Sequence, residues 1–201
     1  MAANRKSYHY NKGELLFKEG DKVEGMYFIH AGKVKVYKKW DDEKELIVRF
    51  AGKGDIVGHR GLGKELYYPA SGTALEPVEV CFFELDFFTS SLKVNHDYTF
   101  QLMMFFAEEL QESEKKMRNM AHMPVKGRVA NALLKLNEKF GANENGAVDI
   151  NITKQDIASY AGTTYETVFR IMNEFIEENI ISTGGKNFSI KNIDALIKCT
   201  Q

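Results

Sequence analysis

The chain has 201 residues, of which 44% are hydrophobic and 27% are charged, and its formal net charge is −1. These values are typical of a globular protein with one large domain or two small ones. They exclude a strongly basic chain, so a nucleic-acid-binding function would depend on the local placement of charge. Residues 125–201 carry nine Lys plus Arg against nine Asp plus Glu.

The sequence predicts a cytoplasmic protein without a membrane segment. Its first residues, MAANRKSYHYNKGE, lack the apolar core of a signal peptide. The longest mostly apolar run, FQLMMFFAEEL, is far shorter than the ~20 residues that cross a bilayer. The two cysteines, Cys81 and Cys199, are too few and too far apart for a disulfide framework or a four-thiolate iron–sulfur cluster.

Residues 11–85 have the pattern of an antiparallel β-structure. Ten glycines separate short stretches rich in β-branched and aromatic residues, among them MYFIH, KVKVYKKW, LIVRF and VEVCFFEL. The piece KVKVYK alternates apolar and polar residues, which is typical of a half-buried strand. Short strands at regular spacing with glycine turns favour a β-roll of the jelly-roll kind, and we assign residues 1–97 to this domain.

Residues 98–122 predict a long amphipathic helix. Its apolar positions recur at alternating spacings of three and four, the a/d pattern of a coiled coil. Such a helix either packs on its own domain or pairs with a second copy of the chain, and the long, narrow seam favours a homodimer. Pro124 ends the helix and marks a hinge, so residues 98–124 are the expected dimerisation segment. The predicted seam consists of Met103, Phe106, Leu110, Ser113, Met117 and Met120.

Residues 125–201 predict a mostly helical third domain, which makes the fold class α+β. The stretch GRVANALLKLNEKFG has the pattern of an amphipathic helix that Gly141 ends. VDINIT predicts a short strand, and ISTGGKNFSI predicts a hairpin around its Gly-Gly turn. The residues expected to face inward from the first helix are Val129, Ala132, Leu133 and Leu136.

Residues 152–181 predict two helices joined by a tight turn. Thr153 and Asp156 have the spacing of a capping box, which starts the first helix. Gly162 suits the left-handed turn between the helices, and Thr164 can cap the second helix. With a strand before it and a hairpin after it, this pattern indicates a winged helix-turn-helix. The residues expected to face inward are Ile157, Ala161, Val168, Ile171 and Phe175.

The outer face of the second helix carries chemistry that its own core does not need. There an arginine such as Arg170 can bond guanine O6 and N7 together, and Glu166 can accept from cytosine N4. Alternatively, Glu166 and Arg170 form an ordinary surface pair four residues apart. Within a winged helix-turn-helix we favour base contact, at the positions that a recognition helix places in the major groove. The candidate DNA contacts are Lys154, Thr164, Tyr165, Glu166, Phe169 and Arg170.

Taken together, the chain resembles the Crp/Fnr superfamily of bacterial transcription regulators, that of the catabolite activator and the fumarate–nitrate regulator. The resemblance rests on KGELLFKEGDKVEGMYFIHAGKVKVYKKW, GKGDIVGHRGL, NMAHMPVKGRVANALLKL and TTYETVFR. It implies a cyclic-nucleotide-binding type of roll, a dimer helix and a sequence-specific DNA-binding domain, with RNA polymerase as a partner. Glu166 and Arg170 match the family's base-reading acid and arginine. Tyr165 replaces the arginine or small residue that often precedes the acid.

The effector loop departs from the members that bind cyclic AMP. Where they have a glutamate that holds the ribose, this chain has His59, and the region of their arginine-serine pair reads Tyr68, Pro69, Ala70. A buried phosphate would lack its bidentate partner here, so we expect either a small effector other than cyclic AMP in the same pocket or a pocket that is filled and takes no effector. The candidate effector-binding residues are Gly58, His59, Arg60, Gly61, Leu62, Tyr68, Ser71, Ser113 and Glu114.

Other cofactors and activities receive less support. The family's iron–sulfur sensors need cysteines near the amino end, and none precedes Cys81. A lone histidine such as His59 or His96 is more often structural than a haem ligand, and the five histidines show no spacing typical of a metal site. Walker, Rossmann and serine-elbow motifs do not occur, so no enzyme activity is predicted. The alternative function is a nucleotide-binding regulatory subunit that acts through protein contacts.

Overall fold

Two compact units make up the chain, residues 1–114 and residues 115–201, and the division lies inside a long helix. The computed structural model describes residues 5–41, 44–185 and 187–201. We call residues 1–114 the roll unit and residues 115–201 the carboxyl unit. Among the described helices, none has the length and apolar character that crossing a membrane requires.

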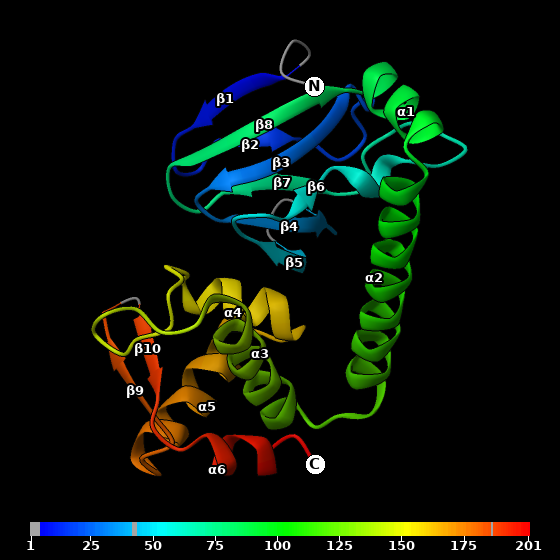
Figure 1. The fold of residues 1–201 in the computed structure, drawn as a ribbon. Helices are drawn as coiled ribbons and strands as arrows, with labels where there is room; N and C mark the ends of the chain where they lie inside the picture. Colours follow the sequence, from blue (N-terminus) through cyan, green and yellow to red (C-terminus); the bar gives the residue numbers. More distant parts are fainter. Residues whose placement is uncertain (1–4, 42–43, 186) are drawn as a thin grey trace. The chain divides into compact units, whose positions relative to one another are not determined.

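In its described part, the roll unit contains two four-stranded antiparallel sheets (Figure 1). One sheet has the order β1-β8-β3-β6 and the other β2-β7-β4-β5. Because strands that are distant in the sequence lie side by side, the chain passes repeatedly between the sheets. The predicted β-roll is confirmed. The strands are β1 (Lys6–Tyr10), β2 (Leu15–Phe17), β3 (Gly25–Ala31), β4 (Val34–Lys39), β5 (Glu45–Ala51), β6 (Ile56–Val57), β7 (Ser71–Ala74) and β8 (Val78–Glu84).

Apolar side chains from both sheets form the core of the roll unit, including Met26 of β3 in one sheet and Val34 of β4 in the other. In strand β4, the alternation of apolar and polar residues predicts burial correctly for the first residues and then fails. Val34 and Val36 are buried, as the alternation predicts, but the next residue, Tyr37, is buried as well. A β-bulge between Val36 and Tyr37 shifts the register and turns the tyrosine inward.

After the roll come the helices α1 (Leu85–Val94) and α2 (His96–His122). The first half of α2 packs on its own unit through Leu102, Phe105 and Phe106, so Phe106 of the predicted seam contacts the core of its own chain. The predicted seam is therefore not one continuous solvent-facing stripe. Other members stay open to solvent: the exposed fractions of Met103, Leu110 and Met117 are 55%, 60% and 61%. Their spacing of seven places them on one face.

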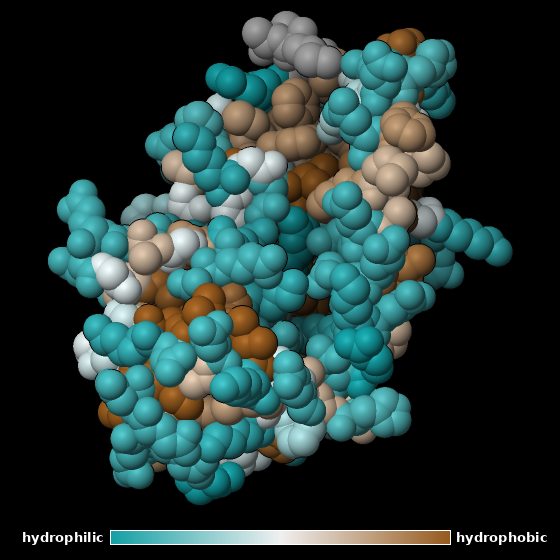
Figure 2. Space-filling view, turned by 60° about the horizontal axis from the view of Figure 1, so that its bottom comes forward, coloured by the Kyte–Doolittle hydropathy of each residue, from teal (hydrophilic) through white to brown (hydrophobic). Residues whose placement is uncertain are grey.

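The surface drawn in Figure 2 is largely hydrophilic, with hydrophobic groups showing in separate places. On α2 the exposed large apolar side chains are Phe100, Met103, Met104, Leu110 and Met117. Exposed apolar groups that share one helix are typical of a surface that a partner covers.

The carboxyl unit is helical with one strand pair. The predicted inward face of α3 is confirmed, because all four expected residues are buried. Strands β9 and β10 pair antiparallel, as the Gly-Gly turn predicts; position 186 of that turn lies outside the described residues. The elements are α3 (Val125–Phe140), α4 (Lys154–Ala161), α5 (Tyr165–Glu177), β9 (Ile181–Gly184), β10 (Asn187–Ile190) and α6 (Ile193–Lys198).

The strand predicted at VDINIT does not form. Val148 makes an isolated bridge with Ala142, and its N–H donates to the carbonyl of Phe188 in β10 at 2.8 Å. Val148, Ile150 and Ile152 are nevertheless all buried. The alternation in the sequence therefore reflects an irregular segment, bent at Asp149, whose apolar side chains enter the core without a partner strand along its length.

Candidate DNA-binding surface and effector pocket

The two helices of the predicted helix-turn-helix begin at well-formed caps. The Thr153 hydroxyl accepts from the Asp156 N–H at 3.0 Å, and the Asp156 carboxylate accepts from the Thr153 N–H at 2.9 Å. This is the predicted capping box of α4. Gly162 ends α4 with a φ of 66°, the left-handed turn that the sequence predicts. Thr164 then caps α5 by accepting from the Thr167 N–H at 3.3 Å.

Burial fixes which side of α5 faces solvent. The predicted inward residues Val168, Ile171 and Phe175 are at most 1% exposed. On the other side, Tyr165 and Phe169 are 43% and 46% exposed, although aromatic rings of this size are usually buried. These are the only two aromatic side chains of the described α5 that remain exposed. The helix therefore presents two large rings that its own core does not use.

The exposed rings form a small cluster with a cation. The rings of Tyr165 and Phe169 stack with their centroids 6.3 Å apart. The ammonium of Lys154, from the start of α4, lies 5.8 Å from the centre of the Phe169 ring. Both helices thus contribute to one surface, which pairs apolar area with positive charge. Such a surface can touch a thymine methyl group and a phosphate together.

Arg170 lies on the same exposed side, with a side chain that is 67% exposed. Its guanidinium donates to the carboxylate of Glu174, one turn further along α5. The surface pair with Glu166 that the sequence offered as an alternative is therefore replaced by a pair with Glu174. Lys126 of α3 also lies 3.3 Å from the Glu174 carboxylate.

An arginine that the sequence analysis missed ties the turn to the end of α2. The guanidinium of Arg128 donates to the carbonyls of Ala161 and Gly162, at 3.0 and 3.2 Å, at the end of α4. It also donates to the carbonyls of Met120 and Met123, at 3.3 and 3.1 Å. Carbonyls at helix ends lack hydrogen-bond donors within the helix, and the planar guanidinium of Arg128 supplies donors to several of them.

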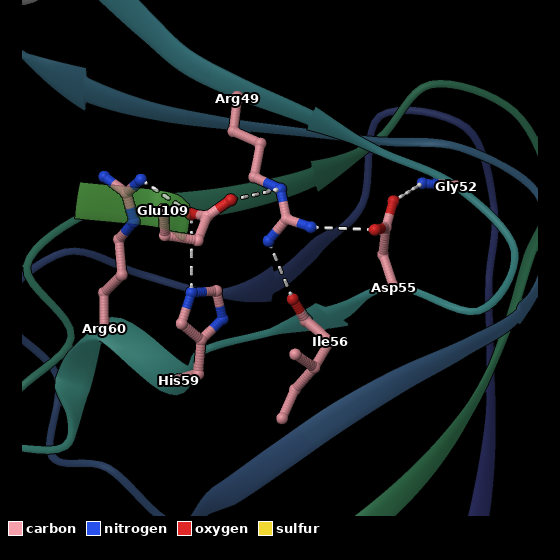
Figure 3. Close-up of polar contacts among 7 residues, drawn as sticks. All are labelled: Arg49, Gly52, Asp55, Ile56, His59, Arg60 and Glu109. Carbon is pink, nitrogen blue, oxygen red and sulfur yellow. Dashed lines mark hydrogen bonds and ion pairs between the residues drawn. The ribbon is translucent and has the colours of Figure 1, made fainter. Parts of the chain in front are cut away.

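In the roll unit, one carboxylate stands at the centre of the candidate effector site (Figure 3). Glu109 projects from α2 toward three nitrogen groups. Arg60 donates to its Oε2 at 2.8 Å, and Arg49 Nε lies 3.5 Å from its Oε1. His59 Nε2 lies 3.7 Å from Oε2, within ion-pair range but beyond a hydrogen bond. The side chain of Glu109 is 19% exposed.

A second carboxylate holds Arg49 in place. Arg49 donates to Asp55 at 2.8 Å and to the carbonyl of Ile56 at 3.1 Å. Asp55 in turn accepts from the Gly52 N–H at 2.7 Å, which fixes the turn before β6 (Figure 3). The guanidinium of Arg49 is therefore shared between Asp55 and Glu109.

The cluster shifts the pKa values of its members. Burial favours neutral imidazole and lowers the pKa of His59 below its ordinary value of 6.5. Burial also raises the pKa of Glu109, but His59, Arg49 and Arg60 lower it by more, to about 2. At neutral pH the site therefore holds an ionised Glu109 beside an uncharged, buried His59. Within the described residues, neither ring nitrogen of His59 has a hydrogen-bond partner.

A pocket opens beside this cluster, with a volume of about 290 Å³ counted up to its open mouth. Most of that volume is open to solvent, and the enclosed part has room for about one water molecule, so a larger ligand would require the lining side chains to move. Gly58 lines it with a φ of 85°, a conformation that favours glycine. The lining residues are Phe17, Val36, Arg49, Val57, Gly58, His59, Arg60, Tyr68, Pro69 and Ala70.

The structure brings only some of the predicted effector residues together. Gly58, His59, Arg60 and Tyr68 line the pocket, but the Tyr68 hydroxyl already donates to the Gly25 carbonyl at 3.0 Å. The other five lie outside the lining. Gly61 and Leu62 pack toward the core, and the Ser71 hydroxyl accepts from the Glu19 N–H. Ser113 and Glu114 follow on α2, where Glu114 is exposed.

Sequence reasoning missed Arg49, Asp55 and Glu109. A signal for Glu109 was present, because Leu102, Phe105 and Phe106 precede it by seven, four and three residues. These positions share one face of a helix, and that face packs on the roll. An acid on a core-facing stripe needs a cation opposite it, and Arg49 is a strand arginine flanked by apolar residues.

Known proteins show similarity over most of the chain. The model of the cyclic nucleotide-binding domain matches residues 8–95, and that of the Crp-like helix-turn-helix domain matches residues 127–199. The chain is 31% identical to the cAMP-activated global transcriptional regulator CRP of Salmonella typhimurium, over 91% of this chain and 88% of that protein. It is 27% identical to the anaerobic regulatory protein of Haemophilus influenzae, over 94% and 74%.

Among solved structures, FixK2 from Bradyrhizobium japonicum has the same fold, with a TM-score of 0.87 at 22% identity over 98% of both chains. The fold and the two matched domains agree with the capped helix pair described above. The chain belongs to the Crp/Fnr family of transcription regulators and carries that family's helix-turn-helix DNA-binding domain.

Proposed function

We propose that this regulator binds a pseudo-palindromic DNA operator as a homodimer and reads its sequence with α5. The observation that carries the proposal is the division of α5 into two faces. Val168 and Ile171 anchor it in the core, while Tyr165, Glu166 and Arg170 remain exposed beside its capped start. Helix-turn-helix proteins place the residues at this end of the second helix against base edges in the major groove.

Each exposed group has a chemical part in this proposal. Arg170 bonds the O6 and N7 of one guanine, and Glu166 accepts from the N4 of a cytosine. The rings of Tyr165 and Phe169 contact thymine methyl groups or sugar, and Lys154 and Thr164 contact phosphate. Residues 125–201 have no excess of positive charge, so affinity depends on these few positions.

The exposed stripe of α2 supports the dimer. Met103, Leu110 and Met117 lie on one face and are more than half exposed, which is costly unless a second helix covers them. Two copies paired along this stripe would present two recognition helices to half-sites one turn of DNA apart, about 34 Å. RNA polymerase is the expected partner of such a regulator, in the cytoplasm.

The roll is proposed to sense a small effector other than cyclic AMP. The Salmonella relative is named as cAMP-activated. This chain instead has His59 in the pocket, an uncharged run of Tyr68, Pro69 and Ala70, and little enclosed space between these side chains. An effector there would contact Arg49, Arg60 and His59, beside Glu109 of α2. Its binding would shift the equilibrium between two conformations of the helices that follow the roll.

Selection of bound duplexes from a random pool with the full chain tests the DNA-binding proposal. We expect a symmetric consensus, and affinity that falls steeply with salt because bound phosphates release counterions. A regulatory subunit that acts through protein contacts would enrich no sequence and show no salt-dependent duplex binding. Repeating the selection with and without a metabolite extract tests for the effector.

A further inference from the structure

The polar end of the roll pocket has the composition of an anion-binding site. Two guanidinium groups and one buried imidazole converge on the same place from β5 and from the turn at residues 59–61 (Figure 3). Such charge-assisted donors bind carboxylates and phosphates strongly. In this chain, however, the place they surround holds the carboxylate of Glu109.

The charges of this cluster cancel. Arg49 and Arg60 carry two positive charges, and Asp55 and Glu109 carry two negative ones, while His59 is uncharged at neutral pH. Asp55 also accepts from the backbone of Gly52, so it belongs to the turn. Glu109 has another origin: it comes from α2, the helix whose exposed stripe forms the proposed dimer contact.

We propose that Glu109 is the specificity-determining residue of this pocket and closes it to anionic effectors, cyclic nucleotides included. This inference rests on the proposed function of the roll as an effector domain. Its carboxylate occupies, from within the chain, the position that a ligand's negative group would take.

An incoming anion faces two unfavourable routes. It can displace Glu109, which leaves a carboxylate partly buried without its cations, a strongly unfavourable state. Or it can enter beside Glu109, where it meets a like charge at short range and no uncompensated cation. An uncharged ligand meets neither obstacle. One ring nitrogen of His59 points away from Glu109 (Figure 3) and has no hydrogen-bond partner among the described residues.

Replacing Glu109 by glutamine tests the proposal, because the amide keeps the size of the side chain and removes its charge. The probes are inorganic phosphate and cyclic AMP, titrated calorimetrically into the full chain. We expect no measurable binding of either probe to the unmodified protein. For Glu109→Gln we expect phosphate affinity at least about tenfold above that of the control, since Arg60 loses its counter-charge.

The matched control is Glu108→Gln, which removes the same charge from the neighbouring, exposed position of α2. Equal phosphate affinity of the two variants, with circular dichroism showing both folded, would overturn the proposal. If Glu109→Gln does not fold, the unmodified chain decides. Phosphate or cyclic AMP that shifts the ring-proton resonance of His59 in that chain would refute exclusion by Glu109, and unchanged resonances support it.

These readouts involve no DNA, so they separate this inference from the proposed function. If the chain binds its operator but Glu109→Gln and Glu108→Gln bind phosphate equally, only the assignment of Glu109 is refuted. Conversely, the chain could bind no duplex while Glu109→Gln gains phosphate affinity. The proposed role of Glu109 would then stand, and the proposed DNA-binding function would fail.

Discussion

Arg170, the arginine expected to read a guanine, is paired with Glu174 one turn further along α5 and not with Glu166. The pair leaves Glu166 available to a base but places an acid beside the arginine. Glu174 also contacts Lys126 of α3, so this acid ties two cations to the protein surface. DNA must therefore compete with Glu174 for Arg170.

Glu174→Gln is expected to tighten binding to the selected operator about twofold. An exposed pair at this spacing stabilises a helix by ~0.2–0.5 kcal/mol, which the DNA no longer has to overcome. Fluorescence anisotropy at fixed salt measures the change. Glu177→Gln is the control, since it removes the same charge from an exposed position of α5 that makes no pair with Arg170. Weaker binding by Glu174→Gln would show instead that the acid orients Arg170.

Arg170→Ala is expected to lose discrimination at one G·C pair in each half-site. A bidentate contact to guanine contributes ~1–3 kcal/mol of selectivity, so affinity should fall on the cognate duplex and little on duplexes altered at that pair. Lys154→Ala supplies the comparison, because loss of a phosphate contact weakens all sequences alike. Uniform loss in Arg170→Ala as well would mean that Arg170 also contacts only the backbone.

Met117→Asp is expected to give a folded monomer that no longer binds the palindrome. Met117 is 61% exposed, so a charge there costs the single chain little, but it would be buried and unpaired in a paired seam. Light scattering after size exclusion measures the mass. Gln111→Asp, also exposed on α2, should remain dimeric because it lies away from the stripe of Met103, Leu110 and Met117. A dimeric Met117→Asp protein would refute the seam.

The helix-turn-helix was predictable because its signals are local. A capping box, a left-handed glycine and a second cap lie within a dozen residues of one another, and each determines backbone geometry without help from distant parts. The bulge at Tyr37 and the missing strand at VDINIT have the opposite cause. Whether a segment finds a partner strand depends on residues far away, and period-two burial alone does not reveal it.

The effector site was predicted in part for the same reason. His59 and Arg60 follow Gly58 directly and are found through the loop pattern. Glu109 lies about fifty residues later, and its meeting with Arg49 requires β5 and α2 to pack together, which composition and spacing do not encode. The apolar face of α2 indicated that Glu109 lies on the side that packs on the roll. The same pattern, however, is also compatible with a glutamate that faces solvent.

Acidification should lower the free energy of unfolding in two separate windows. The pKa of His59 is depressed by burial, so the unfolded chain binds its proton more readily than the folded one. The contribution of neutral His59 to the free energy of unfolding is therefore complete above about pH 6.5 and is lost as the pH falls below that value. The pKa of Glu109 falls from 4.5 to about 2 on folding, so its contribution is lost between those values.

Urea denaturation from pH 8 down to pH 2 measures both windows. His59→Gln should flatten the dependence in the upper window, because glutamine carries no titrating proton yet keeps a donor near Glu109. Glu109→Gln should flatten the lower window by about 1–2 kcal/mol, once the screening of partly exposed groups is allowed for. An unchanged upper window in His59→Gln would assign that titration to another group.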